Sequence, residues 1–189
     1  DVHYEQGYSL YVGIPFCPTT CLYCSFTSFP ITAWRARVEE YLDALEREMD
    51  FVREACRDRV LDSVYIGGGT PTTLEPEQLE RLLSRIRETF DFSQVKEFTV
   101  EAGRADSITA DKLRVLKKYG VTRISVNPQT MNQKTLDLIG RRHTVEQVKE
   151  AFYLARQEGF TNINMDLIVG LPGEEPPEVQ HTMEEIKKL

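Results

Sequence analysis

The 189-residue chain, with a mass of 21.8 kDa, is long enough to bury a hydrophobic core as one domain. Hydrophobic residues make up 41% and charged residues 28%, as in ordinary globular proteins, and the absence of any run of about 18 apolar residues excludes a membrane-spanning helix. The net charge of −7 argues against non-specific nucleic-acid binding, but it is compatible with a local basic pocket for an anionic ligand.

The first half of the chain predicts two strand–helix units. Tyr11–Ile14 is a short apolar strand that ends before a proline, which cannot donate to a central ladder. Apolar residues then recur at three- and four-residue steps, and they predict one long amphipathic helix from Trp34 to Val52. A second strand, Val60–Ile66, stops at three glycines, and Pro76 opens a second helix. The predicted buried face of that helix holds Leu79, Leu82, Leu83 and Ile86.

The second half predicts three more strands with helices between them. The strands are Val95–Val100, Val121–Val126 and Asn162–Val169. The two intervening helices begin at the N-caps Thr109 and Thr144 and end at Gly120 and Gly159. A last helical pattern begins near Pro177.

Five strand–helix units predict an α/β fold whose parallel strands are joined by right-handed crossovers. A doubly wound sheet and a partial α/β barrel both satisfy this pattern. The barrel is favoured, because polar and glycine-rich segments follow the strand ends and no GxGxxG follows the first strand. We expect residues 1–189 to form one core domain from a longer protein, a partial (β/α)6 barrel truncated after about five βα units, because the chain stops inside a helix.

Three of the four cysteines lie in one loop after the first strand, with the spacing CxxxCxxC: Cys17, Cys21 and Cys24. Residues 1–10 lack the pattern of a secretory signal, so we expect a cytoplasmic protein in which this cluster binds a metal and forms no disulfide. Iron–sulfur clusters usually take four thiolates, and three would leave one iron open to an exogenous ligand. A zinc knuckle is the alternative, although the candidate fourth ligands His3 and Cys56 give no familiar zinc pattern. We expect Cys56 to be an inert mid-helix thiol.

Polar and glycine residues after the other strands form a candidate ligand site. Residues 67–70, Gly-Gly-Gly-Thr, either let the backbone approach a ligand closely or form a tight turn, and no Lys-Ser or Lys-Thr follows to make a phosphate-binding loop. Glu101 ends the third strand, where it either accepts from an amine or hydroxyl or caps the surface. Asp166 lies in the apolar fifth strand and needs a partner there, because burial of a lone charge is costly.

Two arginines and a histidine precede the helix that begins at Thr144. Arg141 and Arg142 are either ligand-binding residues or a solvated helix end, and only Arg141 is favoured as functional. His143 stands beside the capping Thr144, and we expect its role to be structural.

These motifs resemble the radical S-adenosylmethionine superfamily. The sequences YVGIPFC and CLYCSF are similar to its oxygen-independent coproporphyrinogen III oxidase branch, and the similarity runs along essentially the whole chain. The resemblance implies a 4Fe-4S cluster held by the three loop cysteines, with S-adenosyl-L-methionine on the open iron as the source of a 5′-deoxyadenosyl radical. It also implies a cofactor site composed of Tyr11, Tyr23, Gly68, Gly69, Thr70, Glu101, Gln129, Arg141 and Asp166.

The resemblance implies an oxidoreductase that converts coproporphyrinogen III to protoporphyrinogen IX in haem biosynthesis by oxidative decarboxylation. Its partners would be this small-molecule porphyrinogen and an electron donor that the sequence does not identify, with no nucleic acid and no membrane. A haem-binding chaperone of the same superfamily, without decarboxylase activity, is the alternative. Phe26 occupies the position of a further cysteine in typical branch members, and Asn127-Pro128 precede Gln129, where many relatives have a glycine. The segments CPTT and VEAGR are closer to an oxidase-named subgroup and favour the enzyme.

Overall fold

A computed structural model describes residue 3 and residues 5–189; residues 1, 2 and 4, on which the expectation about a secretory signal partly rests, lie outside the described residues. Five parallel strands form the main sheet, in the spatial order β1 (Gly7–Ile14), β4 (Val60–Gly68), β5 (Glu97–Glu101), β6 (Arg123–Ser125) and β7 (Ile163–Asn164). Each strand therefore pairs with the next one along the chain. A doubly wound sheet reverses its strand order at a switch point, whereas a barrel adds strands in one direction. The observed order confirms the α/β barrel prediction.

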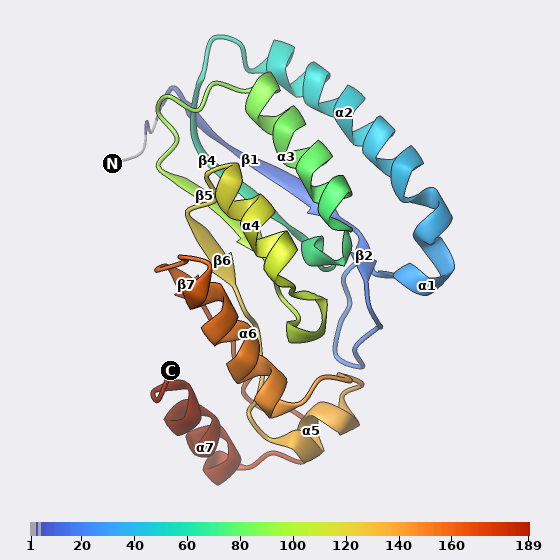
Figure 1. The fold of residues 1–189 in the computed structure, drawn as a ribbon, viewed down its shortest axis with the longest axis vertical. Coiled ribbons are helices and arrows are strands. Elements are labelled where there is room, and N and C mark those ends of the chain that lie inside the picture. Colours follow the sequence, from blue (N-terminus) through green and yellow to red (C-terminus); the bar gives the residue numbers. More distant parts are fainter. Residues whose placement is uncertain (1–2, 4) are drawn as a thin grey trace.

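Four helices pack side by side along this sheet in the same order as the strands (Figure 1). They are α2 (Val38–Ala55), α3 (Pro76–Thr89), α4 (Ala110–Lys118) and α6 (Val145–Gln157). The predicted apolar stripes face the sheet: Leu82 and Leu113 are buried in one hydrophobic core with strand residues such as Ile66 and Val100. Burial of these stripes supplies most of the free energy that holds the helices on the sheet.

The predicted helix boundaries depend on local capping, and the structure confirms them. Thr109 Oγ1 accepts from the backbone N–H of Lys112 at 3.3 Å, and Thr144 Oγ1 accepts from that of Gln147 at 3.1 Å. Gly120 has φ = 80°, a left-handed conformation that glycine adopts without a steric penalty at a helix end. The last predicted helix is α7 (Pro176–Ile186).

The long helix predicted from Trp34 is divided in two. Ile31–Trp34 forms the short helix α1, residues Arg35–Arg37 form a 3-10 turn, η1, and α2 begins only at Val38. The Trp34 backbone leaves the helical region, with φ = −116° and ψ = 2°, while its ring packs on Phe29 with the centroids 4.7 Å apart. The apolar period continues through the break, so the sequence pattern did not reveal it.

The strand predictions need three corrections. Phe16–Cys17 (β2) and Phe29–Pro30 (β3) form an additional parallel pair that brackets the cysteine loop. The expected fifth strand, residues 162–169, shrinks to the two residues of β7, because the backbone N–H of Asp166 donates to Asn127 Oδ1 at 3.1 Å and takes no part in the ladder. Asp166 is also exposed, with its Oδ1 2.7 Å from Asn164 Nδ2, so the expectation of a buried charge was wrong.

Smaller elements complete the chain. Two 3-10 turns, η2 (Pro71–Thr73) and η3 (Ala105–Ser107), follow β4 and β5, and α5 (Gln133–Leu138) precedes α6. Cys56 is the C-cap of α2, so it was wrongly placed in mid-helix. Among the described residues, every helix is too short or too polar to cross a membrane.

Candidate functional site

One cavity of about 170 Å³ lies where the loops after β1, β4, β5 and β6 meet. Its lining includes all three loop cysteines and all but one of the predicted cofactor residues, namely Cys17, Cys21, Tyr23, Cys24, Gly68, Gly69, Thr70, Glu101, Gln129, Arg141 and Asp166. These side chains come from segments up to 149 positions apart, taking the span from Cys17 to Asp166. The parallel topology brings them together, because the carboxyl ends of parallel strands share one edge of the sheet.

The three cysteines occupy different environments within the cavity. Cys17 lies in β2 and is buried, with its Sγ 3.5 Å from Thr70 Oγ1. Cys21 is also buried, and Cys24 is half-buried. All the cysteines are free thiols, and within the described residues no three His, Cys, Asp or Glu side chains are grouped closely enough to hold a single metal ion. An iron–sulfur cluster takes each thiolate on a separate iron, so it does not require the three sulfur atoms to surround one ion.

The glycine segment after β4 fits tightly against the cysteine loop. A Cβ added to Gly69 would lie 2.7 Å from Phe16 O and 2.9 Å from Cys17 Sγ, so only glycine fits there without a shift. The N–H of Gly69 donates to Ile14 O, and that of Thr70 donates to Phe16 O, both at 2.7 Å. Because these two N–H groups are bonded within the protein, the segment is better suited to accept hydrogen bonds from a ligand through its carbonyl oxygens.

Glu101 ends β5 and points into the site, so it is not a surface cap. Its Oε1 accepts from Tyr65 Oη at 2.5 Å. Burial raises the pKa of Glu101, and the negative charge of Asp166 raises it further. The hydrogen bond from Tyr65 lowers the pKa but does not cancel the rise. Tyr11 stacks on Tyr65 with the ring centroids 6.0 Å apart and is 60% exposed. Tyr11 lines a neighbouring cavity of about 360 Å³, which shares Phe26, Gly68 and Glu101 with the first cavity.

Arg141 is buried, with 6% exposure, and is not a solvated helix end. Its Nε donates to Tyr23 Oη at 3.1 Å and its Nη1 donates to Asn127 O at 2.5 Å. Burial raises the pKa of Tyr23 to about 12, against the opposing effect of the adjacent Arg141. Arg142, by contrast, is exposed.

Gln129 and Asp166 lie side by side where β6 and β7 end. The backbone N–H of Gln129 donates to Asp166 O at 3.1 Å, and Gln129 O accepts from the N–H of Ile168 at 3.0 Å. Gln129 is the one non-glycine residue of the described chain with a positive φ, 66°. Left-handed backbone at a non-glycine residue is uncommon and tends to occur at functional sites.

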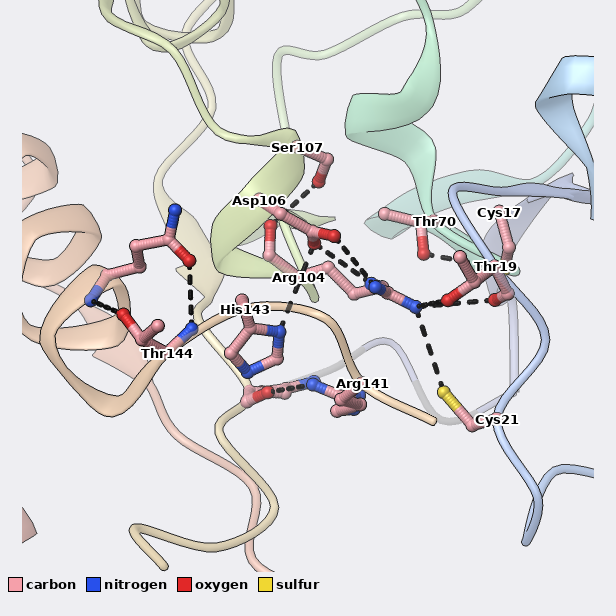
Figure 2. Close-up of polar contacts among 12 residues, drawn as sticks. Cys17, Thr19, Cys21, Thr70, Arg104, Asp106, Ser107, Arg141, His143 and Thr144 are labelled. Carbon is pink, nitrogen blue, oxygen red and sulfur yellow. Dashed lines mark hydrogen bonds and ion pairs between the residues drawn. The ribbon is translucent and has the colours of Figure 1, made fainter. Parts of the chain in front are cut away.

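Four residues at or beside the cavity were not predicted from the sequence to belong to the site, although His143 was expected to have a structural role. Arg104 and Asn127 line it, and Asp106 and His143 lie beside Arg104 (Figure 2). Arg104 and Asp106 follow Glu101 by three and five positions in the loop after β5, which was a usable signal for a site at strand ends. His143 is fully buried, and neither ring nitrogen has a hydrogen-bond partner in the described part of the chain, although Nδ1 lies 4.0 Å from Asp106 Oδ1.

Comparison with known proteins gives one consistent result. Residues 11–186 match the family profile described as "Radical SAM superfamily". The chain is 47% identical to the oxygen-independent coproporphyrinogen-III oxidase-like protein HemZ of Bacillus subtilis and 41% identical to the heme chaperone HemW of the same species. These matches cover 96% and 93% of this chain, and 37% and 46% of those proteins.

A solved structure extends the comparison to three dimensions. The coproporphyrinogen III oxidase HemN of Escherichia coli, described as a radical SAM enzyme, superposes with a TM-score of 0.88 at 33% identity, over 97% of this chain and 42% of that one. The chain thus spans less than half the length of the relatives that it matches.

Proposed function

The chain belongs to the radical S-adenosylmethionine superfamily, and on that premise we propose that its cavity holds a 4Fe-4S cluster together with S-adenosyl-L-methionine. The observation that carries this proposal is the convergence of three free thiols, a glycine cradle and four charged side chains on one cavity. Bound there, the two groups would supply reductive cleavage of a carbon–sulfur bond of the sulfonium.

The donor set fits this pair of groups. Cys17, Cys21 and Cys24 would each bind one iron, which leaves the fourth iron of a cubane for an exogenous ligand. The tight packing of Gly69 against Cys17 keeps side-chain atoms out of the space beside the thiols. The three thiols and the glycine beside them support the proposal.

The polar groups around the cavity suit two charged parts of the cofactor, its carboxylate and its ammonium group. We assign Arg141 to its carboxylate, because a buried guanidinium fixed on one side by Asn127 O presents N–H donors toward an anion. The carbonyl oxygens of Gly68 and Gly69 suit its ammonium group. Glu101 would accept from the ammonium or a ribose hydroxyl, and its raised pKa indicates a carboxylate that lacks a cationic partner until a ligand brings one.

We propose that the reaction is the oxygen-independent oxidative decarboxylation of coproporphyrinogen III to protoporphyrinogen IX. The proposal rests on the relatives named oxygen-independent coproporphyrinogen III oxidase, among them that of Escherichia coli. Tyr11 and Phe26 are exposed apolar groups that line the larger neighbouring cavity, and they suit contact with a tetrapyrrole.

An anaerobic turnover assay tests this function. The protein is reconstituted with iron and sulfide, reduced, and supplied with S-adenosyl-L-methionine and coproporphyrinogen III. Formation of 5′-deoxyadenosine together with vinyl-bearing porphyrin is the expected result. The absence of both products from a protein that carries its cluster would overturn the assignment.

Cysteine variants test the ligand set. Cys21→Ala leaves two loop thiols, and we expect it to lose most of its iron and all cofactor cleavage. Cys56→Ala is the matched control, because Cys56 lies at the C-cap of α2 beside a different cavity, and it should retain both properties. Equal loss in the two variants would contradict the three-thiolate site.

A second candidate function is haem transfer without decarboxylation. It is favoured by the 41% identity to the heme chaperone HemW and by Phe26, which stands where typical oxidases have a further cysteine. Titration with haem distinguishes the two functions. A stoichiometric haem complex that passes haem to an apo-acceptor, with no vinyl product in the turnover assay, would support the chaperone.

A further inference from the structure

Arg104 links the loop after β5 to the cysteine loop. Its side chain is buried, with 2% of the residue exposed, although the backbone lies at the N-cap of η3. Nη1 donates to Thr19 Oγ1 at 2.7 Å and to Thr19 O at 3.3 Å, and it approaches Cys21 Sγ at 3.8 Å (Figure 2). One buried guanidinium thus contacts the cysteine loop at a hydroxyl, a carbonyl and a thiol.

Asp106 fixes the orientation of this guanidinium. Arg104 Nε donates to Asp106 Oδ1 at 3.0 Å and Nη2 donates to Oδ2 at 2.7 Å, a two-pronged pair in which the planar fork cannot rotate (Figure 2). Burial of an arginine is costly unless its charge and its N–H groups are satisfied. Here one edge meets a carboxylate and the other meets the cysteine loop, so the contact is built into the fold.

Within the described residues, neither Cys17 Sγ nor Cys24 Sγ accepts a hydrogen bond from a charged side chain. The hydrogen-bond partner of Cys17 Sγ is the neutral hydroxyl of Thr70, at 3.5 Å. Among the described residues, Arg104 is the one cation with a hydrogen bond to a cysteine sulfur. The direct hydrogen bond from a cation is therefore made to one of the three candidate cluster ligands, Cys21.

We propose that Arg104 is a positioning residue that fixes the cysteine loop for cluster uptake and raises the reduction potential of the cluster through its contact with the Cys21 sulfur. This inference rests on the proposed cluster site. Hydrogen bonds and positive charge at a ligand sulfur stabilise the more negative, reduced state of an iron–sulfur cluster, so they shift its potential upward. Asp106 lowers the reduction potential, because its carboxylate partly neutralises the positive charge of the guanidinium.

Three substitutions test the roles of Arg104 and Asp106 through the sign of the shift in the midpoint potential of the cluster. Arg104→Gln removes the charge, and we expect less iron after anaerobic reconstitution and a midpoint potential below that of the unsubstituted protein. Asp106→Asn leaves the arginine charge unbalanced, and it should shift the potential upward. Arg142→Gln is the matched control, because it removes an exposed arginine near the site, and it should leave iron content and potential unchanged.

The measurements are iron and sulfide per chain and a redox titration followed by electron paramagnetic resonance, neither of which depends on turnover. Potentials that shift in opposite directions in Arg104→Gln and Asp106→Asn support the inference, because a merely structural role moves both variants alike. Potentials and iron contents equal to those of Arg142→Gln would overturn it. If Arg104→Gln fails to fold by circular dichroism, Arg104→Lys keeps the charge without the fork, and it should hold its potential with less iron.

The unsubstituted protein separates this inference from the proposed function. If it takes up no cluster of about four iron and four sulfide ions, the cluster site itself is wrong. If it takes up the cluster and the Asp106→Asn potential does not rise, only the role of Arg104 fails.

Discussion

Gly69 shows how one missing side chain shapes the candidate site. A methyl group there would lie 2.7 Å from the backbone oxygen of Phe16, which no side-chain rotation can move, and 2.9 Å from the Cys17 sulfur. We expect Gly69→Ala to lower the free energy of unfolding by about 1–3 kcal/mol and to reduce iron uptake. The measurement is urea denaturation of the cluster-free protein, followed by iron analysis after reconstitution.

Gly13→Ala is the control for this prediction. A Cβ at Gly13 would make an ordinary 3.5 Å contact with Tyr11, and it should change stability by less than about 1 kcal/mol. Equal destabilisation of the two variants would show that the cradle at Gly69 is not tight.

His143 predicts a specific dependence of stability on pH. Burial lowers its pKa to about 4, and the positive charge of Arg141 adds to this against the opposing effect of Asp106. The unfolded chain therefore takes up the proton first as the pH falls. The neutral His143 contributes fully to the free energy of unfolding above about pH 6.5. This contribution, up to about 3 kcal/mol, is lost as the pH falls toward 4.

Replacement of His143 tests that window. We expect the stability of His143→Gln, measured by urea denaturation between pH 4 and 7, to fall less steeply with acid than that of the unsubstituted protein. His181→Gln, which alters an exposed histidine of α7, should keep the original slope. Parallel curves for all three proteins would contradict a buried neutral histidine.

At the level of single residues, local chemistry could be read from the sequence and distant contacts could not. The cysteine loop and the glycine segment could be recognised as candidate site elements because residue type and spacing are local properties. The contact between Arg104 and Thr19 joins positions 85 apart, and no periodic pattern encodes such a pair. The left-handed backbone of Gln129 was equally hidden, because nothing in its residue type requires it.

At the level of elements, Lys112 connects α4 to the turns beside the site. It is buried, and its Nζ donates to Thr72 O at 2.6 Å and Ser107 O at 3.3 Å, which ties α4 to both η2 and η3. Lys112→Ala should destabilise the protein by about 1–3 kcal/mol, since it leaves buried carbonyl groups without a donor.

Urea denaturation of a control variant on the same helix tests this reading. Lys117 donates to Gly159 O from an exposed position, and Lys117→Ala should cost no more than about 0.5 kcal/mol. A loss for Lys112→Ala as small as that for Lys117→Ala would mean that water replaces the buried contacts.

The elements that the sequence predicted well have signals within one turn or one face. The N-caps at Thr109 and Thr144 and the stripe of α3 are of this kind. The predicted element boundaries were wrong where tertiary contacts determine the backbone conformation. The helix break after Trp34 follows its packing on Phe29, and β7 is short because Asn127 takes a ladder hydrogen bond.

At the scale of the whole molecule, each strand pairs with the next one along the chain, as expected for five consecutive βα units. The barrel could be predicted from the sequence because polar and glycine-rich segments follow the strand ends. The same order makes local stability uneven. Central strands β4 and β5 hold fully buried residues such as Ile66 and Val100, whereas the buried residue of α7 within the described chain is Thr182 alone.

Hydrogen exchange measured by mass spectrometry should therefore be slowest in β4 and β5 and fastest in α7. Thr182 Oγ1 accepts from the N–H of Met131 at 3.0 Å and is the buried anchor of α7. Thr182→Val should speed exchange in α7 about fivefold, because loss of one hydrogen bond costs about 1 kcal/mol, and it should leave β4 unchanged. Equal protection of α7 and β4, or faster exchange in both, would mean that the sheet and this helix open as one cooperative unit.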